Sequence, residues 1–349
     1  MSPDAGPVWS WLNEAMSPPG MASPARDVEI KPLTRKNLAR LDTLNGWVRH
    51  DTDSGYLFDD MKKTPNTDSG FEERAYENGI LDPVASHPPR GFDTARHALA
   101  RRRTSTQPSE KGHRAYSFRV SDSYNETKAA DLVKVKMMRD LEDGDLDYSR
   151  HCGRALTETP PQDFNRGLSN PLPDVIEGLR TMALPNHLRH TALHQDRSSS
   201  LSFSHFAAEF KRTDGDLHQA TVQAAYDGAV LVNARHRALE EARQRGTVAA
   251  ALDKAAEDLA VFTLVSDGKV AEVYGHHFEG GQYHQNLVAS ESLLEYPNRG
   301  RELIRNTQDY ARSKSYELAN LLGAELEEEE EEEEVEVKAK KAVAKGWWW

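Results

Sequence analysis

The chain has 349 residues, of which 38% are hydrophobic and 29% charged, and its formal net charge is −12. This length is enough for a full core, and the polar composition favours one domain with loose ends over two compact domains. The single cysteine, Cys152, excludes an internal disulfide and any multi-cysteine zinc site, as is usual in a reducing compartment.

The negative charge is unevenly distributed. Residues 325–349 hold ten Glu and four Lys, a net charge of −6, so the other 324 residues carry the remaining −6. Nucleic-acid binding is not excluded, because a local basic surface is enough to neutralise phosphates. The chain has no basic segment leading into an apolar one at its start, and no run of about 18 apolar residues. We therefore expect an intracellular protein, nuclear or cytoplasmic, that is neither secreted nor membrane-bound.

The first elements are short. Residues 1–30 are rich in Pro, Ser and Gly, which predicts disorder, and residues 31–69 are predicted to form a short helix, over 32–47, and a loop. Order resumes with a helix over 70–81, which ends at the Asn-Gly stop signal. We expect the main domain to extend from there to residue 324, and residues 325–349 to form an acidic low-complexity tail.

A basic segment follows at 95–114, where the pattern predicts a helix that continues into a loop rich in Ser, Thr and Pro. Arg101, Arg102 and Arg103 lie in this segment. Three interpretations remain open for them: contacts with nucleic-acid phosphates, a nuclear-targeting patch, or the solvated end of a helix.

The centre of the chain alternates between predicted helices and strands. Residues 125–138 predict a helix with Asn125 as N-cap, and its core face includes either Val135 or Met137. Residues 170–181 are short, apolar and flanked by prolines, which favours a strand. Asp214 or Asp216 caps a helix to about residue 233, a further helical segment reaches about 258, and residues 259–278 predict a hairpin that turns at Asp267-Gly268. A helix over 298–324 closes the domain.

The segment 200–212 alternates in the manner of a strand, and this places Glu209 and Lys211 on one face, about 6 to 7 Å apart. Charge at the end of a buried strand has two explanations. The two residues form a solvated pair of little energetic value, or they belong to a site that uses them. The next helix presents Gln219, Gln223 and Tyr226 on one side, at i, i+4 and i+7.

Three histidines, His276, His277 and His284, lie close together in the sequence. Adjacent residues on a strand point to opposite faces, so His276 and His277 are not expected to bind the same metal ion. Exposed strand and turn positions are favoured for these histidines over a zinc site.

The ordered set Pro173-Asp174, Glu209-Phe210-Lys211 and the glutamine-bearing helix resembles the PD-(D/E)xK superfamily of restriction-endonuclease-like nucleases. The resemblance implies an α/β fold with a restriction-endonuclease-like core, in which a mixed central sheet is flanked by helices. It places the aspartate on the second strand and the Glu-x-Lys on the third strand, which is followed by a helix.

Within that superfamily the chain resembles a set of uncharacterised fungal nuclease-like proteins, over about residues 70–323. The further matching pieces are a helix that starts at Asn125-Glu126, an Ala-x-x-Gln helix at 220–223, and a last helix that carries Arg301, Arg305 and Asn306. The spacing Q-x-x-x-Q-x-x-Y departs from the Q-x-x-x-Y element of RecB-like members, which leaves that branch assignment open.

The resemblance implies a metal-dependent nuclease, and the residue types suit that chemistry. Mg²⁺, or Mn²⁺ in its place, prefers oxygen ligands, which Asp174, Glu209 and the backbone carbonyl of Phe210 can supply. The ammonium of Lys211 would stabilise charge that develops at the phosphate. Glu126 is a further candidate carboxylate, and Gln223 a candidate group for orienting the water or the metal ligands.

Three functions therefore compete: hydrolysis of phosphodiester bonds in DNA or RNA, a catalytically inactive nuclease fold that binds nucleic acid or protein, and a scaffold whose acidic tail recruits a basic protein partner. The sequence does not decide between DNA and RNA or between endo- and exonuclease action.

Overall fold

The computed structural model describes residues 63–104, 109–123, 125–141, 147–156, 165–184, 188, 200–213, 215–245 and 249–346, and its last helix has described side chains up to Gly323. The predictions of disorder over residues 1–30 and of a helix over 32–47 lie outside these residues. None of the helices within the described ranges is long and apolar enough to cross a membrane.

A six-stranded mixed sheet forms the centre of the domain, and its strand order follows the sequence. Strands β3 and β4 pair in parallel, and the other neighbours pair antiparallel. The parallel pair requires a long crossover, which two helices between β3 and β4 provide. The strands are β1 (Tyr148–Cys152), β2 (Val175–Arg180), β3 (Leu201–Phe210), β4 (Val261–Ser266), β5 (Val270–Glu279) and β6 (Gln282–Ser292).

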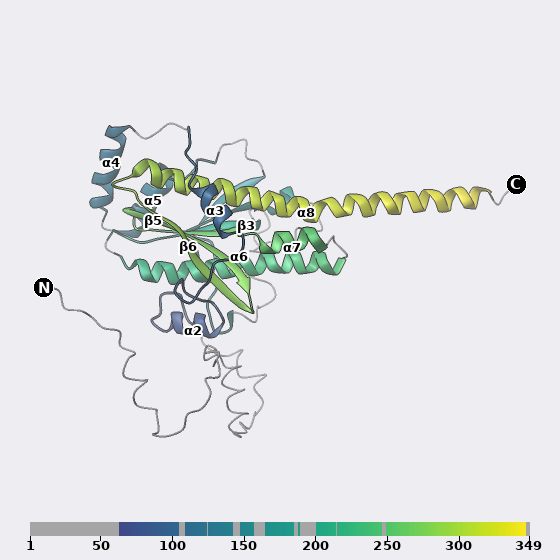
Figure 1. Cartoon of the computed structure of the whole chain (residues 1–349), viewed down its shortest axis with the longest axis horizontal. Helices are drawn as coiled ribbons and strands as arrows, with labels where there is room; N and C mark the ends of the chain where they lie inside the picture. The colour runs from purple at the N-terminus through teal and green to yellow at the C-terminus, as the bar shows by residue number, and fades with distance from the viewer. Residues whose placement is uncertain are drawn as a thin grey trace, which may run out of the picture. The chain divides into compact units, whose positions relative to one another are not determined.

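Helices cover both faces of this sheet (Figure 1), which confirms the predicted fold class. They are α2 (Phe71–Glu77), α3 (Phe92–Leu99), α4 (Glu110–Ser121), α5 (Glu126–Lys136), the short 3-10 helix η2 (Thr181–Ala183), α6 (Leu217–Arg245), α7 (Ala249–Glu257) and α8 (Pro297–Gly346). Side chains of α3, α4, α5 and α8 form one core with the sheet, and those of α2 and α6 form another.

Strand β3 separates the two cores because its side chains alternate between them. Phe206, Ala208 and Phe210 pack in the α8-side core, whereas Ala207 packs in the α6-side core. This alternation is the one that the sequence predicts over 200–212, and it places Glu209 and Lys211 on the α6 side. Unlike an ordinary half-exposed strand, β3 is buried along its whole length.

Several elements differ in extent from the sequence prediction. The helix predicted to end near 233 continues to Arg245, and α8 continues past 324 to Gly346. In α5, Met137 is 2% exposed and Val135 is 64% exposed, so Met137 is the core residue of the two alternatives. Strands β1 and β6 and helix α4 were not predicted, because their polar residues do not follow a clear period of 2 or 3.6.

Two buried histidines should make the fold less stable at acidic pH. Burial lowers the pKa of both His205 and His276 to about 3, and their rings have partners that suit the neutral form: Arg235 Nη1 lies 2.9 Å from His205 Nε2, and Thr263 Oγ1 lies 2.8 Å from His276 Nε2. An unfolded histidine has a pKa of about 6.5. Between these values only the unfolded chain binds the proton, so the free energy of unfolding falls as the pH drops.

We expect each of these histidines to reduce the free energy of unfolding by up to about 1.4 kcal/mol per pH unit between about pH 6.5 and 3. Urea denaturation at several pH values from 7.5 to 4.5 measures this slope. The variant His205→Gln should give a shallower slope, whereas His97→Gln, at an exposed position of α3, should leave it unchanged. Equal slopes in all three proteins would contradict the prediction.

Candidate carboxylate and lysine site

Glu209 is a carboxylate inside the domain, 4% exposed, at the end of β3 on the α6 side of the sheet. Asp174 directly precedes β2, and continuing the antiparallel register from Val175 and Ala208 places Asp174 opposite Glu209. The carboxylate of Asp174 accepts a hydrogen bond from the backbone N–H of Phe210, at 2.7 Å. The structure thus brings together two residues that are 35 positions apart in the sequence.

Helix α6 adds two more polar side chains to this site. Its start is fixed by Asp216, whose side chain accepts from the backbone N–H of His218 at 2.9 Å. Gln223 and Asp227, one turn apart, are 5% and 1% exposed, and Asp227 lies within hydrogen-bonding reach of Glu209. Asp227 was missed in the sequence, although an aspartate inside the apolar run AAYDGAVLV is the same kind of anomaly that drew attention to Glu209.

The pKa values of all three carboxyl groups are raised, and burial is the largest cause for each. Burial raises the pKa of Asp227 to about 7, and the negative charge of Asp174 adds to the effect. The pKa of Glu209 lies well above its usual value, first because of burial and then because of Asp227. Burial also raises the pKa of Asp174, despite the hydrogen bond from Phe210. Such a cluster holds protons at neutral pH unless a cation compensates its charge.

Three buried oxygen atoms of the site lack a hydrogen-bond partner within the described part of the chain. Glu209 Oε1, Asp227 Oδ2 and Gln223 Oε1 are buried and have no hydrogen-bond partner among the residues that the structure describes. In an extended strand the N–H and C=O of a residue point to the same neighbour, so the carbonyl of Phe210 faces the side of Asp174. Carboxylate and carbonyl oxygens are the ligands that Mg²⁺ prefers, so this donor set fits a hard divalent cation.

Lys211 is the cation of the site, and its side chain is 10% exposed. The backbone N–H of Lys211 donates to the carbonyl of Ser266 at 2.9 Å, which extends the pairing with β4 by one residue. Its ammonium lies 3.7 Å from a carboxylate oxygen of Glu126, the first residue of α5. Four of the side chains proposed from the sequence, Asp174, Glu209, Lys211 and Glu126, therefore lie around the end of β3. The fifth, Gln223, lies one helical turn before Asp227 on α6, and its amide donates to the carbonyl of Asn66 at 3.5 Å.

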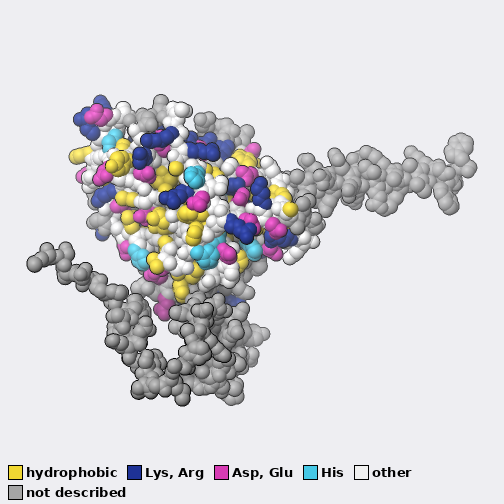
Figure 2. Space-filling model, in the orientation of Figure 1, with side chains coloured by type: hydrophobic (Ala, Val, Ile, Leu, Met, Phe, Trp, Pro, Cys, Tyr) yellow, Lys and Arg dark blue, Asp and Glu magenta, His cyan; other side chains and the backbone are white. Residues whose placement is uncertain are grey.

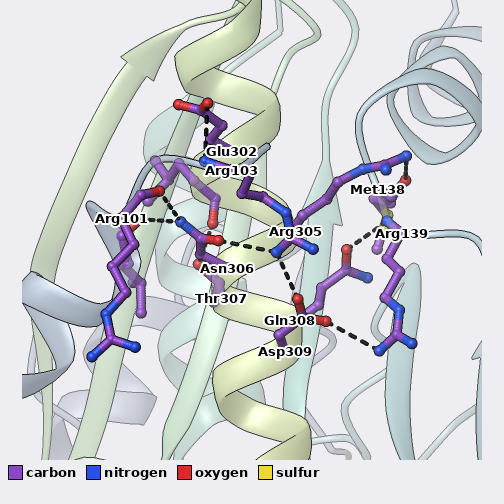
Figure 3. Close-up of polar contacts among 12 residues, drawn as sticks. Arg101, Arg103, Met138, Arg139, Glu302, Arg305, Asn306, Thr307, Gln308 and Asp309 are labelled. Atoms are coloured by element: carbon purple, nitrogen blue, oxygen red, sulfur yellow. Dashed lines mark hydrogen bonds and ion pairs between the residues drawn. The ribbon is translucent and has the colours of Figure 1, made fainter. Parts of the chain in front are cut away.

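Arg305 and Asn306 of the last helix lie elsewhere, on the α8 side of the sheet (Figure 3). Arg305 donates to the carbonyls of Met137 and Met138, at 3.2 and 3.0 Å, and Asn306 donates to the carbonyls of Leu99 and Arg101, at 2.8 and 2.7 Å. These bonds hold α8 against the segments that follow α5 and α3. Arg305 and Asn306 therefore support the fold and do not reach Glu209.

The basic segment after α3 also packs against α8. Arg102 pairs with Glu302 at 3.0 Å, and Arg103 pairs with Asp309 at 2.6 Å. On the face shown in Figure 2, the positive side chains alternate with negative ones, and the described residues form no continuous basic stripe there. The arginine run is thus partly neutralised within the domain itself.

Beside it lies a hollow of about 680 Å³ that is lined by four arginines and two aspartates. The arginines are Arg103, Arg139, Arg305 and Arg312. Below it, the fully buried Glu177 of β2 accepts from Arg150 at 2.7 Å and from Gln308 at 2.6 Å. No local pattern in the sequence indicates this polar cluster, because its members come from distant segments that include β1, β2 and α8.

These features define a mixed α/β domain with a cluster of carboxylates and a lysine at the end of a central strand. Residues 134–309, about half of the chain, match the family described as a domain of unknown function (DUF7924), and the chain belongs to that family. The matched segment contains Asp174, Glu209, Lys211, Gln223 and Asp227, but not Glu126. No curated protein and no solved structure matches the chain.

Proposed function

We propose that this protein is a metal-dependent nuclease that hydrolyses phosphodiester bonds of nucleic acid at the site around Glu209. The observation that carries the proposal is the meeting of Asp174, Glu209 and Asp227 beside Lys211 at the end of β3. The resemblance to PD-(D/E)xK nucleases supports it through Asp174, Glu209 and Lys211. An intracellular location, nuclear or cytoplasmic, goes with this function, as does the single cysteine.

The carboxylate cluster costs folding free energy, and this cost is a physical argument that the site binds a cation. Three carboxyl groups with raised pKa values, of which Glu209 and Asp227 are buried, destabilise a fold, and unsatisfied buried oxygens add to that cost. A structural ion pair would need neither feature. A bound Mg²⁺ or Mn²⁺ would neutralise the phosphate and lower the pKa of an attacking water.

The protein's own groups have separate roles in this proposal. Asp174, Glu209, Asp227 and the carbonyl of Phe210 hold the cation. Lys211 places a positive charge where the phosphate gains negative charge, and its side chain is held by Glu126 at 3.7 Å. Gln223, with its unsatisfied oxygen, orients a water or a metal ligand.

A second function has its own supporting observation. The hollow lined by four arginines suits a phosphate or another anion, and it lies on the α8 side of the sheet, away from Glu209. A nuclease fold that binds nucleic acid or protein without turnover would use this hollow, and Glu209 would not contribute to it.

The test incubates the full chain with Mg²⁺ or Mn²⁺ and a panel of single- and double-stranded DNA and RNA. We expect cleavage of at least one substrate, and a loss of about 100-fold or more in the variants Glu209→Gln and Lys211→Met. Glu73→Gln and Lys136→Met remove the same charges at exposed positions and should cleave as the unchanged protein does.

Two results would decide against the nuclease. Cleavage that persists in Glu209→Gln would place the activity elsewhere, in the protein or in a contaminant. Absence of cleavage together with binding that depends on Arg139 and Arg312 would establish the second function instead.

A further inference from the structure

Three histidines from distant parts of the sequence meet at the β5–β6 hairpin. His277 of β5 lies directly opposite His284 of β6, and their rings stack with centroids 4.7 Å apart. His87, from the loop before α3, lies with its ring centroid 4.1 Å from that of His284. One ring nitrogen from each of the three histidines lies within 4.8 Å of the others.

The sequence predicted exposed strand and turn positions for His276, His277 and His284, and the structure corrects this. His276 and His284 are each 3% exposed, and the side chain of His277 is 10% exposed. The expectation that His276 and His277 point to opposite faces is right, because His276 is buried against Thr263 on the other face. Pairing across the hairpin, rather than adjacency along one strand, is what brings two imidazoles together.

These imidazoles have unused nitrogens. Both ring nitrogens of His277 and the Nδ1 of His284 are buried without a hydrogen-bond partner among the described residues. Burial lowers the pKa of His277 to about 3 and also lowers that of His284, so both rings stay neutral at physiological pH. A neutral imidazole offers a lone pair, and a buried unpaired nitrogen is costly unless something binds to it.

A carboxylate completes the set. Glu279, the last residue of β5, has an oxygen 3.7 Å from the Nδ1 of His87 and 3.7 Å from the Nε2 of His277. Both distances exceed hydrogen-bonding range, so the carboxylate stands beside the imidazoles without bonding to them. Three nitrogens and one oxygen are a donor set that zinc takes in tetrahedral sites.

We propose that His87, His277, His284 and Glu279 form a zinc-binding site that fastens the 82–91 loop to the β5–β6 hairpin. In a tetrahedral zinc site with bonds of about 2.0 to 2.1 Å, the ligand nitrogens are about 3.3 Å apart. The stacked rings of His277 and His284 would have to turn for their lone pairs to converge on one ion. With four protein ligands the site is closed, so the zinc has a structural role.

The loop is already held in place for this role. The backbone N–H of Leu81 donates to the carbonyl of Tyr283 at 2.9 Å, and that of Gln285 donates to the hydroxyl of Ser86 at 2.8 Å. His87 follows directly after Ser86, so it needs little ordering to bind. The site is independent of the nuclease proposal, because imidazole ligands select zinc, whereas the oxygens around Glu209 select magnesium.

The test strips the full chain with a chelator, removes the chelator and titrates Zn²⁺ by calorimetry. All proteins carry Cys152→Ser, which removes an exposed thiol that binds zinc on its own. We expect one site per chain with a Kd below about 1 µM, and a higher Tm with zinc. Co²⁺ in place of zinc should give the visible absorption of a tetrahedral site, which an octahedral oxygen site does not give.

His87→Gln is the decisive variant, because His87 is exposed and its replacement leaves the core intact. We expect it to weaken zinc binding about 100-fold and to remove the tetrahedral Co²⁺ spectrum, as His284→Gln should also do. His97→Gln, another exposed histidine, should bind zinc as the parent does. Equal zinc affinity in His87→Gln and His97→Gln, or no zinc binding by the parent, would overturn the proposal.

Discussion

Replacing Glu209 with glutamine is expected to weaken Mg²⁺ or Mn²⁺ binding by about 100-fold or more and, in metal-free protein at neutral pH, to stabilise the fold. The first effect follows because the amide removes a charged ligand from the site. The second follows because Glu209, Asp227 and Asp174 repel one another when ionised, and an amide of the same shape ends the repulsion. The amide N–H can also donate to Asp227 in place of the carboxylic acid.

The gain in the free energy of unfolding without metal should be about 1 to 3 kcal/mol, since a buried charge without a compensating partner is costly. Calorimetric titration with Mn²⁺ and urea denaturation in a chelator measure the two effects on the same protein. A group that only stabilises the fold would give the opposite result, because its removal would lower the stability and leave metal binding unchanged.

The control variant is Glu240→Gln, in which a half-buried glutamate on α6 loses the same charge away from the cluster. It should change metal affinity by less than about twofold and stability by less than about 1 kcal/mol. A loss of stability in metal-free Glu209→Gln would contradict the idea that the cluster awaits a cation.

Replacing Gly228 with alanine is expected to reduce the free energy of unfolding by about 3 kcal/mol. A Cβ atom at this position would lie 2.2 Å from the Nδ1 of His276 and 2.4 Å from its Cε1. His276 cannot move aside easily, because it is fully buried and bonded to Thr263 at 2.8 Å. The helix α6 would therefore have to shift away from β5.

Such a shift would also affect the site, since Gly228 follows Asp227 directly. We expect metal affinity to fall together with stability in Gly228→Ala, as measured by urea denaturation and Mn²⁺ titration. Gly323→Ala is the matched control, because a Cβ there meets nothing within 4 Å in α8 and should gain up to about 1 kcal/mol. If the free energy of unfolding of Gly228→Ala lies within about 0.5 kcal/mol of the parent's, the close approach of α6 to His276 does not limit stability, and the prediction is wrong.

The sequence determined the elements whose periodicity is strong. The strand that ends at Glu209 and Lys211 alternates apolar side chains, the helix after it begins at an aspartate cap, and the Asp267-Gly268 turn joins two β-rich runs. Local patterns of this kind depend on backbone geometry and burial, which act within about ten residues. Glu209 and Lys211 could be named because charge next to an apolar run is costly unless it is used, whereas Asp174, Glu126 and Gln223 were named from the family resemblance.

Only the tertiary structure decided which of these residues meet. The antiparallel register of β2 and β3 places Asp174 opposite Glu209, and the close packing of α6 on the sheet adds Asp227. Helix packing places Arg305 and Asn306 away from the site, where their hydrogen bonds hold α8 against the rest of the domain. Contacts between residues far apart in the chain depend on strand pairing and helix packing, and no local pattern encodes them. The contact of His87 with His277 and His284 is of this kind, so only the tertiary structure reveals it.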